Sequence, residues 1–179
     1  MNYIIVDLEA TCWENRSDGK NEIIEIGAVK VNDDQEIVSE YQQFVKPLKN
    51  PILSEFCKEL TSIQQTDVDN APYFFEVLPS FQEWIGDELY LLCSWGFYDR
   101  KQFEEDCDLH QIDKKWLVNH ISLKHQHAKI ANLRRAIGMK NALKQEGIDL
   151  AGTHHRGIDD ARNITKIFLK YFGQWSYSS

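Results

Sequence analysis

The amino-acid sequence predicts a three-layer α/β domain in which helices flank a mixed central sheet. Residues 3–9 form an apolar run rich in β-branched side chains, two further strand-like runs follow, and residues 89–95 form a second continuous apolar run. Strands that give way to helical segments indicate a sheet covered on both faces. The chain has 179 residues, of which 42% are hydrophobic, and this is enough for one domain with a sizeable core.

The strands are expected in the first half of the chain and once more near its middle. The inner part of residues 3–9 is apolar on both faces, which is typical of a buried central strand. Residues 22–31 and 37–46 flank a turn-rich segment at 32–35, which predicts a hairpin. Residues 13–21 form a polar connection between the first two strands. Residues 89–95 predict a buried return strand that Gly96 ends.

Helices are expected over most of the chain after residue 50. Pro72 can start a helix that reaches Ile85, and Pro79 is expected to kink or divide it. The last predicted helix has the clearest apolar face of all. The predicted helices lie at residues 54–61, 72–85, 99–107, 122–137, 139–146 and 157–172.

Cysteine spacing and hydropathy exclude several classes of protein. The longest apolar runs are too short to span a membrane, and Asp7 interrupts the first run before the core of an export signal forms. A cytoplasmic location without a membrane partner is therefore expected. Cys12, Cys57, Cys93 and Cys107 lie far apart, which excludes a zinc site or a disulfide scaffold. Each is expected to be a small buried hydrophobe.

The net charge of −8 is unevenly distributed along the chain. Residues 114–145 carry eight basic side chains and no acidic one, which makes this basic window a candidate track for nucleic-acid phosphates. A solvated helix face that offsets acidic neighbours is the alternative. The eight side chains are Lys114, Lys115, Lys124, Lys129, Arg134, Arg135, Lys140 and Lys144.

Two carboxylates lie two residues apart on the first strand, Asp7 and Glu9. Side chains alternate along a strand, so both are expected on the same face. Two neighbouring carboxylates at the end of an apolar strand repel each other and lose solvation. A hard divalent cation such as Mg²⁺ or Mn²⁺ would compensate, and a bridging Arg or Lys is the alternative.

Two more acids are expected near the same edge of the sheet. Asp99 follows the return strand, where α/β sheets assemble their sites, although it would also suit a helix N-cap. In the last helix, Asp160 falls at about 200° on the helical wheel, inside the apolar arc of roughly 180–320°, whereas Asp159 falls at about 100°. Asp160 is therefore expected to face the protein and Asp159 to face away. A histidine in the polar segment 153–157 could then act as a general base.

Three ordered motifs resemble those of the DEDDh family of 3′→5′ exonucleases. They are D-L-E-A-T at residues 7–11, W-G-F-Y-D at residues 95–99, and H-x4-D from His155 to Asp160. Residues 22–28, 53–63 and 154–160 are similar to the branch that contains the ERI-type and histone-mRNA 3′ exonucleases. The similarity extends from Tyr3 to about Phe172, in the order that the family shows.

This resemblance implies an RNase H-like (exonuclease) fold and a single exonuclease domain over residues 1–179, with its core at about 3–172. It also implies metal-dependent 3′→5′ hydrolysis of single-stranded nucleic acid to nucleoside 5′-monophosphates by a two-metal mechanism, with RNA favoured over DNA. The implied partner is the 3′ end of the strand. Two cations can stabilise both the attacking and the leaving oxygen of such a displacement.

By the same resemblance, Asp7, Glu9 and Asp160 would hold the first of two Mg²⁺ or Mn²⁺ ions. Asp7 would also bind the second, which Asp99 would support directly or through water. His155 would deprotonate the attacking water.

The resemblance also implies the residues that contact the substrate. Backbone groups around Ala10 and Thr11 would receive the terminal ribose. Phe56 and Tyr98 would stack on the last base, with ordinary core packing as the alternative for both.

Two other functions fit the same motifs. The first is a non-catalytic module that binds a protein or RNA on an exonuclease fold. The second is a proofreading exonuclease associated with a polymerase, or a trimmer of short oligoribonucleotides. The four acids and His155 favour an enzyme, because a non-catalytic module has no physical need for a cluster of mutually repelling carboxylates.

Overall fold

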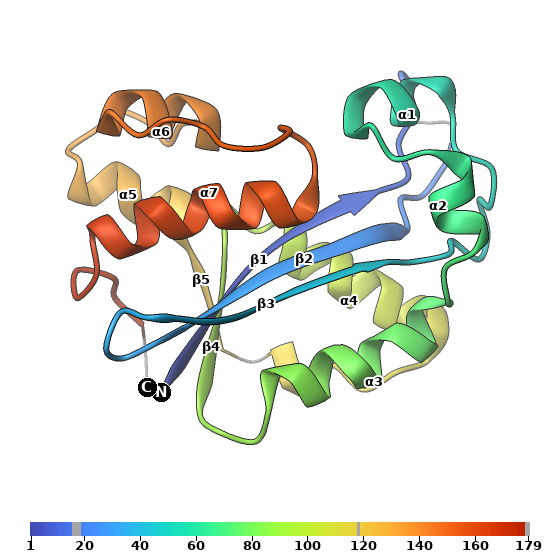
Figure 1. Ribbon diagram of the computed structural model, residues 1–179, viewed down its shortest axis with the longest axis horizontal. Helices are drawn as coiled ribbons and strands as arrows, with labels where there is room; N and C mark the ends of the chain where they lie inside the picture. The colour runs from blue at the N-terminus through green and yellow to red at the C-terminus, as the bar shows by residue number, and fades with distance from the viewer. Residues whose placement is uncertain (16–18, 118, 178–179) are drawn as a thin grey trace.

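The computed structural model describes residues 1–15, 19–117 and 119–177 and forms a mixed sheet with helices on both faces (Figure 1). The strand order is β3-β2-β1-β4-β5. Strand β1 is antiparallel to β2 and parallel to β4, and β4 is parallel to β5. The strands are β1 (Asn2–Ala10), β2 (Ile23–Asn32), β3 (Ile37–Phe44), β4 (Tyr90–Ser94) and β5 (His120–Ser122).

Strand β1 lies in the middle of the sheet, as its two apolar faces predict. Ile4, Val6 and Leu8 pack on the side of the sheet that α3 (Phe74–Ile85) and α4 (Tyr98–His110) cover. Tyr3 and Ile5 pack on the opposite side, against α6 (Met139–Glu146) and α7 (Gly157–Lys170). The molecule is therefore a three-layer α/β structure, and the predicted fold class is confirmed.

The predicted hairpin between the second and third strands is also confirmed. β2 and β3 pair in antiparallel register from Glu25 opposite Phe44 to Val31 opposite Ile37. The side-chain oxygen of Asn32 accepts hydrogen bonds from two backbone N–H groups of the turn. The polar connection at 13–21 lies partly outside the described residues, at 16–18.

Three short helices complete the fold. α1 (Glu55–Thr61) and α2 (Gln65–Asp69) lie beyond the end of β1, and α5 (Leu123–Ile130) follows β5 (Figure 1). Ser54 caps α1, because its hydroxyl accepts a hydrogen bond from Cys57 N at 3.0 Å. No helix in the described part of the chain has both the length and the apolar character needed to cross a bilayer.

Two helix predictions need correction. Pro79 does not divide α3, which continues through it as one helix, since the burial of its apolar face outweighs the one backbone hydrogen bond that a proline removes. A kink at Pro79 stays a prediction. The helix expected at 122–137 ends at Ile130 and is preceded by β5. Asn132 takes a left-handed conformation there, and Leu133 N bonds to Ala128 O at 2.7 Å, which closes the helix end. The five-residue α2 is too short for its periodicity to predict it.

Candidate active site

The sheet topology brings the four predicted acids to one edge of the molecule. β1 and β4 run parallel, so their carboxyl ends meet at the same edge, where α/β proteins place their sites. β1 carries Asp7 and Glu9, and the first turn of α4, just after β4, carries Asp99. The first turn of α7 carries Asp160. These four residues are called the acidic cluster below.

Two glycines allow the start of α7 to lie directly on the sheet. A Cβ atom at Gly27 of β2 would lie 2.1 Å from the backbone carbon of Gly157 and from the nitrogen of Ile158. A Cβ atom at Gly157 would lie 2.9 Å from the carbonyl oxygen of Asp7. No side chain fits in either place, and this close contact of backbones brings Asp160 within reach of β1.

The two adjacent aspartates of α7 point in different directions, as the helix geometry predicts. Asp160 is buried, with 4% of its surface exposed. Asp159 remains partly exposed, and its carboxylate accepts a hydrogen bond from Thr153 N at 2.9 Å and pairs with Arg162 at 3.0 Å. Asp159 therefore supports the loop before α7, while Asp160 faces the acidic cluster.

The carboxylates of the acidic cluster lie close together. Oxygens of Asp7, Glu9 and Asp160 are all within 4.8 Å of one another. Oδ1 of Asp99 accepts a hydrogen bond from Leu8 N, between the two acids of β1, at 3.1 Å. Asp99 is not the N-cap of α4, because Phe97 occupies that position. The N-cap alternative for Asp99 is therefore wrong.

Burial and mutual repulsion make the ionised cluster unfavourable without a cation. Burial raises the pKa of Asp7 well above its ordinary value, and the charges of Asp99 and Glu9 raise it further. Burial and the charge of Asp160 raise the pKa of Glu9 to about 9, and burial raises that of Asp99 to about 6. A bound cation would offset these costs.

The donor set fits a hard divalent cation better than a bridging base. Within the described residues, no Lys or Arg forms an ion pair with Asp7, Glu9 or Asp99. No described residue donates a hydrogen bond to the carboxylate of Asp7 or Glu9 either. Closely spaced carboxylate oxygens are the ligands that Mg²⁺ and Mn²⁺ prefer.

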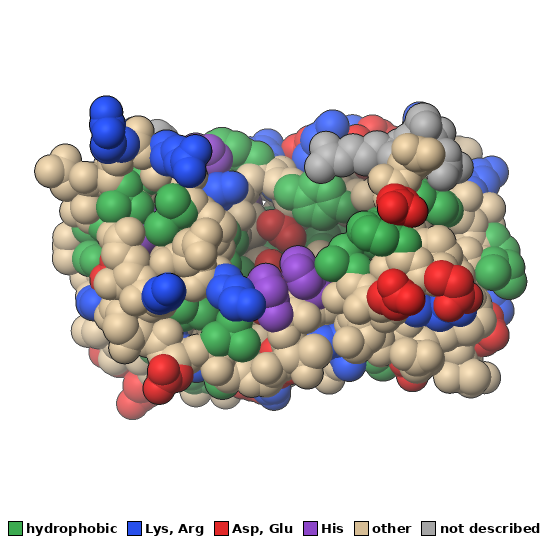
Figure 2. Space-filling view, turned by 90° about the horizontal axis from the view of Figure 1, so that it is seen from above, with side chains coloured by type: hydrophobic (Ala, Val, Ile, Leu, Met, Phe, Trp, Pro, Cys, Tyr) green, Lys and Arg blue, Asp and Glu red, His purple; other side chains and the backbone are tan. Residues whose placement is uncertain are grey.

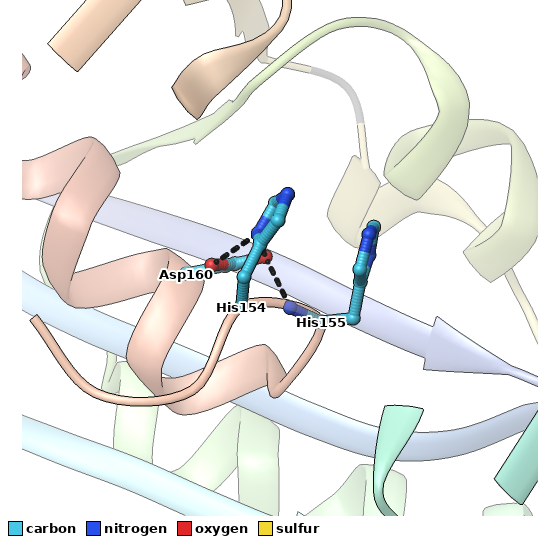
Figure 3. A group of neighbouring side chains, drawn as sticks. All are labelled: His154, His155 and Asp160. Carbon is cyan, nitrogen blue, oxygen red and sulfur yellow. Dashed lines mark hydrogen bonds and ion pairs between the residues drawn. The ribbon is translucent and has the colours of Figure 1, made fainter. Parts of the chain in front are cut away.

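The two histidines before α7 lie against Asp160 in different ways (Figure 3). Nδ1 of His154 lies 2.9 Å from Oδ2 of Asp160, whereas His155 donates its backbone N–H to the same oxygen at 3.0 Å. The two rings stack with centroids 3.9 Å apart. Burial, and to a lesser extent His154, lowers the pKa of His155. The sequence did not indicate the contact between His154 and Asp160.

Phe56 and Tyr98 are not core residues. They are 39% and 50% exposed, and both line a cavity of about 1110 Å³ whose described lining includes none of the four acids. Ala10 and Thr11 are buried instead, and their contacts are internal. The hydroxyl of Thr11 accepts a hydrogen bond from Glu22 N, and Ala10 O contacts the thiol of Cys57. A contact of Ala10 and Thr11 with the ribose stays a prediction.

The basic window divides into two parts. Lys114 and Lys115 form ion pairs with Asp108 and Asp113, so their charges are balanced locally. The other six form no ion pair with a described residue, and they make up the basic strip. Figure 2 shows Lys and Arg gathered over α5 and α6, beside the hollow where acidic and histidine side chains meet. The basic strip consists of Lys124, Lys129, Arg134, Arg135, Lys140 and Lys144.

Sequence reasoning missed one buried charge beside this site. Glu25 lies on β2 opposite Glu9, and its carboxylate pairs with Arg156 at 3.1 Å. The signal was visible in the sequence, because a glutamate inside the apolar run 22–31 needs a buried partner. The partner itself lies 131 residues away.

Sequence comparison identifies relatives of this chain. A model of the RNase_T exonuclease family matches residues 4–168. ERI1 exoribonuclease 2 of Xenopus laevis is 32% identical over 188 residues, which cover 92% of this chain and 27% of that protein. The chain thus spans about a quarter of the length of this relative.

Solved structures show the same architecture. The nuclease domain of 3′hExo, a DEDDh family member bound to rAMP, matches with a TM-score of 0.92 and 30% identity, over 99% of this chain and 96% of that one. A 3′-exonuclease that recognises the 3′ end of histone mRNA stem-loop matches with a TM-score of 0.89 and 28% identity. The match covers 99% of this chain and 70% of that one. The predicted RNase H-like exonuclease fold is thereby confirmed. The match to the exonuclease family model, the fold shared with these nucleases and the order of the four acids lead to one conclusion. The chain belongs to the DEDDh family of 3′→5′ exonucleases.

Proposed function

We propose that this chain removes nucleoside 5′-monophosphates from the 3′ end of single-stranded RNA in a reaction that needs Mg²⁺ or Mn²⁺. The observation that carries the proposal is the gathering of Asp7, Glu9 and Asp160 within 4.8 Å, beside the loop that holds His155. The active unit is a single exonuclease domain with its core at about residues 3–172. A cytoplasmic location stays a prediction from the sequence.

The acidic cluster would hold two divalent cations. Asp7, Glu9 and Asp160 would bind the first, and Asp7 and Asp99 would support the second. When bound, the cations would supply Lewis-acid stabilisation of the attacking and leaving oxygens. They would also neutralise carboxylates that otherwise repel a phosphate, which allows a protein with a net charge of −8 to bind a polyanion.

His155 would act as the general base. Because burial lowers the pKa of this imidazole, the ring is unprotonated at neutral pH and can accept a proton from water. The water oxygen then bonds to the phosphorus of the last phosphodiester, and the bond from phosphorus to the preceding 3′ oxygen breaks. The leaving oxygen takes up a proton, and the terminal nucleotide departs as a 5′-monophosphate.

Two exposed aromatic side chains, of Phe56 in α1 and Tyr98 in α4, would receive the terminal nucleotide. Phe56 and Tyr98 are exposed on the cavity wall, and a base can stack on such side chains whatever its identity. Backbone groups around Ala10 and Thr11 would contact the ribose. RNA is favoured over DNA because the similar nuclease domain of 3′hExo was solved with rAMP and a second similar 3′-exonuclease recognises an mRNA stem-loop.

The decisive experiment follows a 3′-labelled strand. The protein should release labelled mononucleotide from single-stranded RNA with Mg²⁺ or Mn²⁺, faster than from matched DNA or duplex. Excess EDTA and a blocked 3′ end should each stop the reaction. Cleavage that persists in EDTA, or products that begin as internal fragments, would overturn the proposal. Binding without cleavage would identify a non-catalytic module instead.

The basic strip would carry the phosphates that lie upstream of the cleaved bond. Reversal of Arg134 and Arg135 to Glu should weaken RNA binding and lower the log–log salt slope by roughly 2, since about two phosphate contacts are lost. Reversal of Lys114 and Lys115 is the matched control, because their charges are already paired. Equal slopes for the two double variants would assign the basic strip to a solvated surface.

A further inference from the structure

The buried carboxylate of Glu25 makes four hydrogen bonds, and three of them reach the start of α7. Glu25 has no exposed surface. Its Oε1 accepts from Nη2 of Arg156 at 3.2 Å and from Nε2 of Gln42 at 2.7 Å. Its Oε2 accepts from Nε of Arg156 at 3.1 Å and from Gly157 N at 3.0 Å. This is a two-point arginine–carboxylate pair, which fixes orientation as well as distance.

Arg156 and Gly157, the two partners of Glu25 at the start of α7, directly follow His155 in the chain. Arg156 is the residue before the first turn of α7, and Gly157 is the first residue in it. The guanidinium of Arg156 also lies over the ring of Phe44, at 5.2 Å from its centroid. The two residues after His155 are therefore held on the sheet. The side chain of Arg156 contacts both β2 and β3, and the backbone N–H of Gly157 bonds to β2.

The backbone of His155 needs this support. Its φ angle is +65°, a conformation that a residue with a side chain rarely adopts and that persists only when its surroundings hold it. On one side, Asp160 accepts the N–H of His155 at 3.0 Å, and Asp159 accepts that of Thr153 at 2.9 Å. On the other side, the anchor is Glu25.

We propose that Glu25, through its paired contacts with Arg156 and Gly157, is a positioning residue that holds His155 where the reaction needs it. The proposal rests on the proposed exonuclease function, in which His155 is the base. Glu25 itself does not touch the substrate. Arg156 has a second role, because its charge balances a carboxylate that sits directly opposite Glu9 on the neighbouring strand.

The test compares two pairs that join a strand to α7. Glu25→Gln keeps the shape of the side chain and removes its charge. Glu40→Gln is the matched control, because Glu40 of β3 also binds an arginine of α7, Arg162, but on the exposed surface. For Glu25→Gln we expect kcat to fall by about 10- to 100-fold, since small displacements of a reacting group cost that much. KM and Mn²⁺ affinity should stay within about twofold, and Glu40→Gln should behave as wild type.

Arg156→Lys provides the second variant. Lysine keeps the charge but cannot form the two-point contact, so kcat should fall here too, with KM and Mn²⁺ affinity unchanged. If Glu25→Gln does not fold, the kcat, KM and Mn²⁺ affinity of Arg156→Lys test the proposal in its place. Failure of both variants to fold would show that the pair serves stability alone and would overturn the proposal.

Two results in folded variants would also overturn it. The first is a kcat equal to that of wild type in Glu25→Gln. The second is a loss of Mn²⁺ affinity in parallel with kcat, since Glu25 would then support the whole site and not His155 in particular.

A readout without catalysis separates this proposal from the proposed function. The NMR signals of the six histidine imidazoles should move in Glu25→Gln only for His154 and His155, and for neither in Glu40→Gln. If the wild-type protein degrades no RNA, the proposed function fails, and these signals still decide the positioning role. Unchanged signals of His155 would overturn it.

Discussion

Two sets of carboxylates at this edge of the sheet differ in how their charge is satisfied. Glu22, Glu25 and Asp106 are buried, and each accepts several hydrogen bonds from protein donors. These are the anchored carboxylates. In the acidic cluster, by contrast, Asp7 and Glu9 accept no hydrogen bond from a described residue. Asp7 and Glu9 therefore differ from the anchored carboxylates, each of which has donors within the protein.

Hydrogen-bond donors distinguish a buried carboxylate with a structural role from one that would bind a cation. Glu22 shows the first case clearly, because it accepts the backbone N–H groups of Leu48, Lys49 and Asn50 at 2.6–2.9 Å. Such donors replace the hydrogen bonds to water that a buried carboxylate loses. Asp7 and Glu9 have no such donors in the described residues, and burial and mutual repulsion raise the pKa of both. A divalent cation would offset this cost.

The largest effect should follow the loss of one member of the acidic cluster. Asp160→Asn should nearly abolish RNA cleavage, because a proposed metal ligand is lost. The loss of a group that only orients a metal ligand costs roughly 10- to 100-fold, which is less. The rise in Tm with Mg²⁺ should also disappear. The metal-free protein should not lose stability, because one repelling charge is gone. Cleavage assays and melts with and without Mg²⁺ measure these effects.

Asp159→Asn is the matched control on the same helix. The carboxylate of Asp159 is anchored by Thr153 and Arg162, so this variant should keep most of its activity and its Mg²⁺-induced rise in Tm. An inactive Asp159→Asn beside an active Asp160→Asn would contradict the assignment of Asp160, and not Asp159, to the metal site.

The next largest effect is expected for His155. His155→Ala should lower kcat by about 10²–10⁴-fold, the usual scale for a general base, while Mg²⁺ affinity stays unchanged. Since only the neutral ring accepts a proton and burial lowers the pKa of His155, the acid limb of the kcat profile should lie below the ordinary histidine pKa of 6.5.

His154→Ala is the control for this assignment. Its ring contacts Asp160, yet we expect only a mild loss, because a cation on Asp160 makes a protein donor there dispensable. Equal losses at the two positions would leave the choice of His155 as base without support.

A smaller effect, on stability alone, is expected for an anchored carboxylate. Glu22→Ala leaves three backbone N–H groups without their partner. It should lower the free energy of unfolding by about 1–3 kcal/mol, the range for a buried polar group that is left without a hydrogen-bond partner. The Mg²⁺-induced rise in Tm should be the same as in wild type. A variant that loses this rise would place Glu22 in the metal site.

The stability of the metal-free protein should also depend on pH. Glu9 has an ordinary pKa of 4.5 and a folded pKa of about 9, so the folded state binds more protons between these values. The free energy of unfolding should therefore fall as the pH rises from 4.5 to 9. Saturating Mg²⁺ should remove this contribution, as should Glu9→Gln. Denaturant unfolding across this range measures the slope.

Asp106 serves as the internal control for the pH dependence. Burial raises its pKa to about 7, but it lies outside the acidic cluster and bonds to Ile23 N and Gln102. Its contribution has the same sign and should persist with Mg²⁺, and Asp106→Asn should remove it. A slope that Mg²⁺ leaves entirely unchanged would contradict a cation site at Glu9.

The sequence by itself determined the elements that carry the site. Apolar side chains on both faces placed β1 in the middle of the sheet, and alternation put Asp7 and Glu9 on one face. The 3.6-residue period was enough to turn Asp160 inward and Asp159 outward. These features follow from local backbone geometry, which a short stretch of sequence encodes completely.

Only the tertiary structure decided which side chains meet. It paired Glu25 with Arg156 across 131 residues, balanced the charges of Lys114 and Lys115, and laid the ring of His154 against Asp160. It also ended α5 at Ile130. A side chain's partner depends on strand register and on how the helices pack over the sheet. The periodicity of one segment does not encode either of these. For this reason the face of each acid could be predicted, while its hydrogen-bond partners could not.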